Sequence, residues 1–330
     1  MAKKVTIRDI AQRARVGVGT VSRVLNGGSV SKETRERVLK VINELGYRPN
    51  PHARMLAGGK TNRVMFIFPE MRNEFHWRLL KSFDLTLDGY DYQTVVYPLI
   101  SDNRLKKLRS DKQLLKEVDA VVVATVPLDT TFGKRPDFAQ PLILIEWVHE
   151  DYDCINVDNE YGGRKAAELL LEHQPNEFFA IQSYETNPMI ADKHLWERFN
   201  GFKKVLLEAG YDFPDDHIIY ADLFTGPPHD KVFEILTKYD RPAIFALTDN
   251  YALIVLQIAS TLGKKPGKDF FLVGFDDQYW AREGGLTTIK QPVEEMGAKA
   301  AEIALKRIRN PDAPIEHVKF VPTVVRRLTA

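Results

Sequence analysis

The chain has 330 residues, of which 44% are hydrophobic, enough for two or three compact units with apolar cores. Its single cysteine, Cys154, excludes an internal disulfide, and neither a membrane-spanning apolar run nor an export signal is recognisable, so a cytoplasmic protein with no membrane partner is expected. The net charge of +1 hides an asymmetry, because residues 1–60 hold 13 Lys and Arg against 4 Asp and Glu, net +9, and the remainder is net −8. A small basic unit on a larger acidic one is typical of a DNA reader attached to a part that does not contact DNA.

The N-terminal segment predicts three short helices with a tight turn between the first two. Thr6 and Asp9 have the spacing of a capping box, and apolar residues then recur at helical spacing. The helices are expected to begin after Thr6, near Val18 and at Ser31, and to end near Ala14, near Leu25 and before Gly46. Such a module places its second helix in the major groove of duplex DNA while the first helix crosses the backbone.

This segment closely resembles the helix-turn-helix headpiece of the LacI/GalR family of bacterial repressors. The resemblance implies that Val18 and Gly19, at the start of the second helix, read bases, and that Arg23 contacts a base or a phosphate. The other implied DNA contacts in the headpiece are Thr6, Thr20, Ser22 and Asn26.

The headpiece departs from the family pattern at two positions in its turn. Arg15 stands where the family usually has Gly, and Gly17 stands where it usually has Ser. Arg15 must therefore adopt a turn conformation that Gly enters more easily, and we expect it to add a phosphate contact. Gly17 replaces a Ser N-cap at a cost of a few tenths of a kcal/mol, so the fold should survive.

Residues 49–57 form a candidate hinge helix, with Pro51 suited to its first turn. A helix of about seven residues is too short to be stable alone. In the family such helices form on DNA, paired across the dimer axis, and a Leu opens a central base step in the minor groove. Leu56 occupies that position with Ala53 beside it, and the marginal stability of the helix suits a switch.

From Arg63 onward, short apolar runs alternate with helical patterns, which predicts parallel sheets. About 270 residues of this pattern predict two doubly wound α/β lobes that bind ligand at the carboxyl ends of their strands. Candidate strands are 64–68, 92–97, 120–125, 142–145, 178–182, 218–220, 243–246 and 270–274, and candidate helices are 77–87, 112–116, 162–172, 198–209, 228–236, 251–262 and 293–308.

The body also resembles the family's sugar-binding core, which shares the periplasmic-binding-protein fold. The matching segments are 157–162, 198–202, 248–252, 273–277 and 286–292. By position, the implied effector contacts are Phe75, His76, Glu146, Arg198, Asp249 and Asp276, with Trp147 and Phe224 offering aromatic faces to a sugar. Carboxylates and Arg suit hydroxyl groups, which both donate and accept, and the carboxylates argue against a sugar phosphate. Three alternatives stay open: Arg198 as an ion pair between the lobes, Asp249 as a helix cap, and Phe75, His76 and Trp147 as core or surface residues that touch no ligand.

The expected organisation is a helix-turn-helix domain over 1–48, a hinge and linker over 49–60, and a two-lobed core over 61–330. Within the core, the first lobe is expected to take about 61–158 with a segment near 280–292. The second lobe is expected to take about 159–279 with 293–330.

These features predict a transcriptional regulator, most simply a repressor, that acts as a homodimer on a pseudo-palindromic operator. A neutral sugar between the lobes is the expected effector, with no cofactor or metal. A purine or another metabolite is the alternative effector. A sugar-processing enzyme is the alternative of a different class, but the sequence holds no nucleophile elbow, P-loop or zinc-protease motif.

Overall fold

The computed structural model describes residues 5–25, 28–47, 60–69, 74–133, 136, 138–183, 193–221 and 226–330. Its contacts divide the chain into two compact units, Met1–Asn62 and Arg63–Ala330. The candidate hinge helix over 49–57 lies outside the described residues.

The first unit contains the three expected helices, α1 (Ile7–Ala14), α2 (Val18–Leu25) and α3 (Lys32–Glu44). Thr6 caps α1 in a capping box with Asp9, as its sequence predicts, and the Ser31 side chain caps α3. All three helices turn an apolar face inward, and the buried residues are Ile10, Ala11, Ala14, Val21, Val24, Val38 and Val41. The opposite faces are therefore left to charged and polar side chains.

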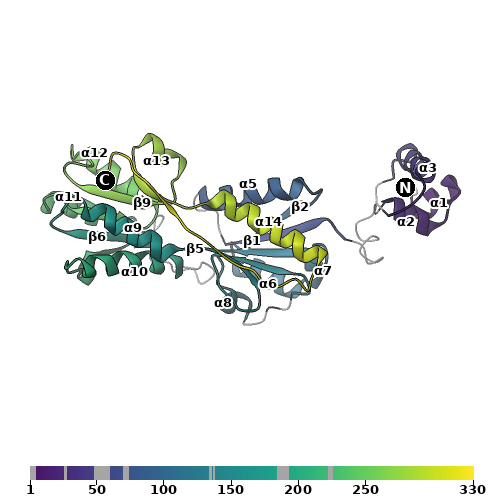
Figure 1. Ribbon diagram of the computed structural model, residues 1–330, viewed down its shortest axis with the longest axis horizontal. Coiled ribbons are helices and arrows are strands. Elements are labelled where there is room, and N and C mark those ends of the chain that lie inside the picture. Colours follow the sequence, from purple (N-terminus) through teal and green to yellow (C-terminus); the bar gives the residue numbers. More distant parts are fainter. Residues whose placement is uncertain are drawn as a thin grey trace. The chain divides into compact units, whose positions relative to one another are not determined.

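The second unit contains two six-stranded sheets flanked by helices (Figure 1). The strands of the first sheet are, in spatial order, β11 (His317–Phe320), β5 (Asp153–Val157), β4 (Leu142–Ile145), β3 (Ala120–Ala124), β1 (Arg63–Phe68) and β2 (Gln93–Pro98). Those of the second are β12 (Thr323–Val325), β10 (Thr287–Lys290), β9 (Phe271–Phe275), β8 (Ala243–Ala246), β6 (Phe178–Ser183) and β7 (Ile218–Ala221). Among the strands of the described residues, β12 alone pairs antiparallel, so the other strands of each sheet end on one edge.

The helices follow the strands in the alternation that the sequence predicts. The first lobe, built on the sheet that contains β1, has α5 (Glu74–Asp88), α6 (Asp102–Ser110), α7 (Lys112–Lys116), α8 (Leu128–Phe132) and α14 (Val293–Arg309). The second lobe, built on the sheet that contains β6, has α9 (Asn159–Leu171), α10 (Lys193–Glu208), the short 3₁₀ helix Asp215–His217, α11 (His229–Lys238), α12 (Asp249–Thr261) and α13 (Tyr279–Glu283).

The C-terminal third of the chain crosses between the lobes differently from the sequence-based expectation. Strand β10 was expected in the first lobe, but it pairs with β9 and buries Ile289 in the second. Helix α14 was expected in the second lobe, but it packs against α5 and the first sheet. Strand β11 then completes the first sheet and β12 the second. Segment 280–292, helix α14 and strand β11 were therefore expected in the wrong lobe, whereas β12 lies in the second lobe as expected. Contacts distant in sequence decide where short apolar segments are buried.

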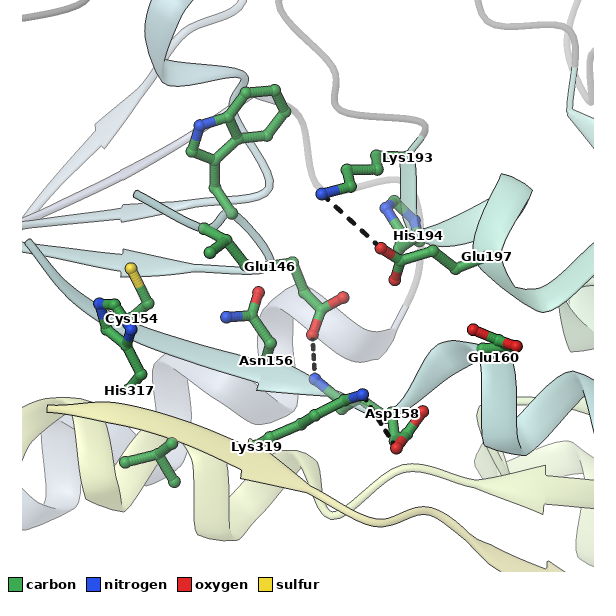
Figure 2. Close-up of a pocket in the computed structure, with 14 residues that line it drawn as sticks. Glu146, Cys154, Asn156, Asp158, Glu160, Lys193, His194, Glu197, His317 and Lys319 are labelled. Carbon is green, nitrogen blue, oxygen red and sulfur yellow. Dashed lines mark hydrogen bonds and ion pairs between the residues drawn. The ribbon is translucent and has the colours of Figure 1, made fainter. Parts of the chain in front are cut away.

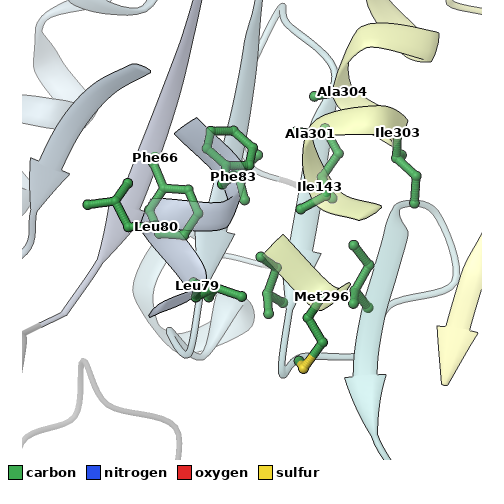
Figure 3. Packing of buried hydrophobic residues seen from close by; sticks show 14 of the residues in the cluster. Phe66, Leu79, Leu80, Phe83, Ile143, Met296, Ala301, Ile303 and Ala304 are labelled. Atoms are coloured by element: carbon green, nitrogen blue, oxygen red, sulfur yellow. The ribbon is translucent and has the colours of Figure 1, made fainter. Parts of the chain in front are cut away.

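Helices α5 and α14 lie side by side over one face of the first sheet (Figures 1 and 3). Phe66 of β1 packs with Phe83 of α5, with ring centroids 5.0 Å apart, and Met296 of α14 joins the same core. At Gly297 a Cβ would meet the backbone of α5, 3.1 Å from the Phe83 nitrogen. This close packing makes α5 and α14 one rigid layer of the first lobe.

Candidate functional site

The exposed face of the first unit carries most of the expected DNA-contacting residues. Val18 at the start of α2 is 43% exposed, although it is apolar. Nothing lies within 4 Å of the position where Gly19 would carry a Cβ, so this turn of α2 leaves room for a close approach. The Arg23 side chain follows one turn later, and its Nε donates to the Gly19 carbonyl oxygen at 3.3 Å.

Of the remaining residues that were expected to contact DNA, some lie within the described part of the chain and three lie outside it. Arg15 is exposed and ends α1 in the left-handed region, at φ 52° and ψ 49°, as the sequence predicts. Thr20 and Ser22 are partly exposed on α2, and the Thr6 hydroxyl donates to Asp9 at 2.6 Å. Asn26, Ala53 and Leu56 lie outside the described residues.

In the second unit, strained backbone marks the carboxyl ends of three strands. Thr125 follows β3 at φ 55°, Glu146 follows β4 at φ 58°, and Asp276 and Asp277 follow β9 at φ 116° and 53°. None of these four residues is glycine, and each such conformation costs about 1–3 kcal/mol. Strain of this kind persists where the surrounding structure holds a side chain in a required direction. We call Thr125, Glu146, Asp276, Asp277 and the side chains around them, at the carboxyl ends of β3, β4 and β9, the strand-end site.

Arg198 of α10 lies at the centre of the strand-end site and is almost fully buried. Its Nε donates to Asn159 Oδ1 at 2.9 Å, and its Nη1 donates to the Leu247 carbonyl oxygen at 2.8 Å. Nη1 also lies 3.5 Å from Asp276 Oδ1, and the guanidinium lies 3.6 Å from the centroid of the Phe275 ring. Burial lowers the pKa of Arg198, while the nearby Asp276 and Glu146 oppose that shift.

Glu146 of the first lobe is connected to Arg198 of the second through Asn159, the first residue of α9. Glu146 Oε1 accepts from the Val157 backbone N–H at 2.8 Å, and Oε2 accepts from Asn159 Nδ2 at 3.0 Å. Burial raises the pKa of Glu146 to about 7, although Arg198 and these hydrogen bonds act in the opposite direction. The site therefore holds a carboxyl group that titrates near neutral pH.

Asp276 presents an unused oxygen to the strand-end site. Its Oδ1 accepts from Gln291 Nε2 at 2.6 Å. Among the described residues, Asp276 Oδ2, Gln291 Oε1 and both amide atoms of Gln182, near the end of β6, are buried without a hydrogen-bond partner. A buried polar atom without a partner is costly, so a cluster of them points to a bound polar molecule.

Asp249, by contrast, uses both oxygens within the protein. Oδ2 accepts from the Gln278 backbone N–H at 2.9 Å, and Oδ1 accepts from the Thr288 hydroxyl at 2.7 Å. Thr248, not Asp249, occupies the N-cap position of α12. Burial and the nearby Asp276 carboxylate raise the pKa of Asp249 well above its usual value. Asp249 therefore braces the loop after β9 and the strand β10 beside the site.

Two neutral imidazoles border the strand-end site. His76 Nε2 and the Thr125 hydroxyl are 2.8 Å apart, and burial lowers the pKa of His76 to about 4. Burial lowers the pKa of His194, at the start of α10, to about 3. In the described part of the chain, Nδ1 of each ring is buried without a hydrogen-bond partner. Phe75, the other expected contact on this segment, packs instead in the core of the first lobe.

A pocket of ≈ 300 Å³ opens beside the strand-end site and is lined from both lobes (Figure 2). Figure 2 shows Glu146 facing Lys193, His194 and Glu197 of α10 across this pocket. Trp147 lines the same pocket and is partly buried. Phe224, the second expected aromatic contact, lies outside the described residues.

Comparison with known proteins identifies the family. The profile of the bacterial regulatory proteins of the lacI family matches residues 6–50, and that of the periplasmic binding protein-like domain matches residues 177–330. The ribose operon repressor of Halalkalibacterium halodurans is 31% identical over 337 residues, which cover 98% of this chain and 97% of the relative. The chain belongs to the LacI family.

Other LacI-family members agree along the full length. The transcriptional regulator DegA of Bacillus subtilis is 29% identical over 98% of this chain and 97% of its own. The structure of the regulator CelR in complex with cellobiose covers 99% of this chain and all of its own, with 26% identity and a TM-score of 0.69. A Lac repressor dimer bound to operator shares the fold, with a TM-score of 0.82, 22% identity and 99% coverage of both chains.

The expected fold class, family and regulatory role are thereby confirmed. This LacI-family chain is a DNA-binding transcriptional regulator and not an enzyme. Among the described residues, no helix is long and apolar enough to cross a membrane, and no group of His, Cys, Asp and Glu side chains is arranged to hold a metal.

The structure also adds residues that sequence reasoning missed. Asn159, His194 and Gln291 lie at the strand-end site, and Gln182 has unpaired buried amide atoms near the end of β6. Asn159 and Gln291 fall within segments that resemble the family, so their polar character inside matched segments was an available signal. Gln182 and His194 offered none, because an amide in a buried strand and a His near a helix start are common for structural reasons.

Proposed function

We propose that the chain is a repressor that binds a pseudo-palindromic operator as a homodimer in the cytoplasm, and that a neutral polyhydroxylated molecule at the strand-end site controls its operator affinity. The observation that carries the effector class is the set of unpaired buried atoms, in which amide donors and carbonyl or carboxylate acceptors are mixed. Sugar hydroxyls both donate and accept, so they satisfy such a mixed set.

Charge supports a neutral effector. Arg198 is the cation at the centre of the site, and Asp276 and Glu146 already face it. A phosphorylated ligand would meet these carboxyl groups without an unpaired cation among the described site residues to balance its charge. Two of the names fit a sugar, since one relative is a ribose operon repressor and one structure is a CelR–cellobiose complex, while other relatives are PurR repressors.

The homodimer is supported by apolar side chains exposed on the first lobe. Trp77 and Leu85 are eight residues apart on α5, and so lie on one face of that helix, and both are exposed. Val96 is exposed on β2, the edge strand of the first sheet. A second copy of the chain would cover these side chains. Sedimentation at micromolar concentration measures whether the chain is a dimer.

The effector proposal is tested by thermal unfolding against a panel of ribose, cellobiose, other neutral sugars, purines and sugar phosphates. A ligand at about 100 times its dissociation constant adds about 2.7 kcal/mol of stability, which is a visible shift. Stabilisation by a neutral sugar supports the proposal. Stabilisation by purines or phosphates alone overturns the effector class and leaves the regulator intact.

The DNA proposal is tested on an operator selected from random duplexes, with salt varied. Operator affinity should fall steeply as salt rises, since basic side chains displace counterions from phosphates. Leu56→Ala should weaken operator binding but not binding to unrelated DNA, because a Leu that opens a base step acts only in the specific, kinked complex. Equal losses of affinity for both DNAs would contradict this role of Leu56.

A further inference from the structure

Arg78 of the first lobe contacts backbone atoms of the second lobe. It lies on α5 and is 7% exposed. Its Nε and Nη2 donate to Glu294 of α14 at 2.7 and 2.8 Å, a bidentate pair within the first lobe. Its remaining nitrogen, Nη1, donates at 3.3 Å to the carbonyl oxygens of both Asp276 and Asp277 in the second lobe.

The two carbonyl groups that Arg78 holds belong to the strained loop after β9. Asp276 and Asp277 both have positive φ, and this conformation directs the Asp276 carboxylate toward Arg198. A second contact joins α5 to the same loop, because the Tyr279 backbone N–H donates to Glu74 Oε2 at 2.9 Å. The first turns of α5 thus bind Asp276, Asp277 and Tyr279 of the other lobe.

We propose that Arg78 is a positioning residue for the effector site: anchored by Glu294, it stabilises the left-handed backbone at Asp276 and Asp277, and so aims the Asp276 carboxylate only when the lobes are closed. The effector part of this inference rests on the proposed function. The positioning part does not, because it concerns only contacts within this chain.

The geometry favours positioning over a purely local ion pair. A pair confined to the first lobe would need only the two nitrogens that face Glu294. A planar guanidinium has a further edge, and here that edge is directed at carbonyl oxygens across the lobe boundary. Hydrogen bonds from a charged donor are stronger than neutral ones, so two of them can hold a strained segment. Opening the lobes would release both.

The test is peptide-level hydrogen exchange of the full chain without ligand, comparing residues 276–283 with the β8 segment 243–247. Arg78→Met should speed exchange in 276–283 by about ten-fold or more and leave 243–247 unchanged. Arg282→Met is the matched control, since Arg282 is also near Asp277, at 3.7 Å, but on the same lobe and 60% exposed. It should change neither peptide.

Arg78→Lys separates positioning from simple stability. Lysine keeps the charge and can pair with Glu294, but its single nitrogen cannot lie both at the edge that faces Glu294 and at the Nη1 position that faces the two carbonyl oxygens. We expect it to restore the unfolding midpoint and to leave 276–283 exchanging fast. Unchanged exchange in Arg78→Met, or full protection in Arg78→Lys, would overturn the proposal.

The same variants are then taken through the sugar and purine panel. Loss of stabilisation in Arg78→Met, for whichever molecule stabilises the wild type, would extend the role to effector binding. If no molecule stabilises the wild type, the proposed function fails, and the exchange result still decides the role of Arg78.

Discussion

Replacing Gly163 with alanine tests how the effector site is built. Gly163 of α9 faces α10, where an added Cβ would overlap the Arg198 carbonyl oxygen and lie 2.7 Å from the Arg198 carbonyl carbon. Gly201 of α10 is in the reciprocal position against Glu160. The obstructing atoms are backbone atoms, so no side-chain rotation relieves the overlap and the two helices must separate.

The expected loss of stability follows from two opposing effects. Overpacking a tight contact costs about 1–3 kcal/mol, and backbone overlap belongs at or above the upper end. Alanine recovers about 1 kcal/mol through its higher helix propensity. We therefore expect Gly163→Ala to lower the free energy of unfolding by about 2 kcal/mol.

Urea unfolding of the full chain, followed by circular dichroism, measures this difference. Asn200→Ala is the matched control, because Asn200 is exposed on α10 and gains helix propensity without an overlap. A Gly163→Ala protein as stable as the wild type would refute the close-packing argument. Because the shifted backbone carries Arg198, weaker binding of the panel ligand should accompany the loss.

Three further outcomes are expected. Arg198→Met should abolish stabilisation by the panel ligand and keep operator binding, whereas a normal ligand response would remove Arg198 from the site. Burial raises the pKa of Glu146 from 4.5 to about 7, so the folded protein holds this proton more tightly than the unfolded chain. As pH rises from about 4.5 to about 7, the free energy of unfolding of the wild type should therefore fall by up to about 3 kcal/mol relative to that of Glu146→Gln. Urea titrations at several pH values measure both free energies. Curves of stability against pH that run parallel for the two proteins would contradict the raised pKa. Arg15→Gly should leave the headpiece at least as stable, because it removes about 1 kcal/mol of strain from the left-handed backbone conformation. It should also lower the slope of log operator affinity against log salt concentration by about 0.9 for each lost phosphate contact. An unchanged slope would mean that Arg15 does not touch DNA.

The headpiece could be predicted almost completely because its signals are local. The Thr6–Asp9 capping box and the turn at Arg15 act within a few residues of where they occur. Each depends on short-range hydrogen bonds and on the apolar period of one helix. Most strands and helices near the strand-end site were also predicted, since buried parallel strands show as apolar runs, but β5 and β10 were not among the expected strands.

The lobe that each C-terminal element joins could not be predicted in this way. Ile289 of β10 and Met296 of α14 are both apolar and lie seven residues apart, yet they are buried in different lobes. An apolar residue in the sequence indicates that its side chain is buried in a core, but it does not indicate in which core. Pairing of β10 with β9 and close packing of α14 on α5 decided the matter.

The sequence by itself thus determined the family, the DNA-binding headpiece and the polar residues at the ends of strands. Tertiary structure decided what those residues do. Asp249 and Asp276 are both carboxylates beside buried strands. Both oxygens of Asp249 accept hydrogen bonds, from Gln278 and Thr288, whereas one oxygen of Asp276 has no partner among the described residues. That difference depends on partners 15 to 39 residues away, brought within hydrogen-bonding distance only when β8, β9 and β10 pair in the second sheet.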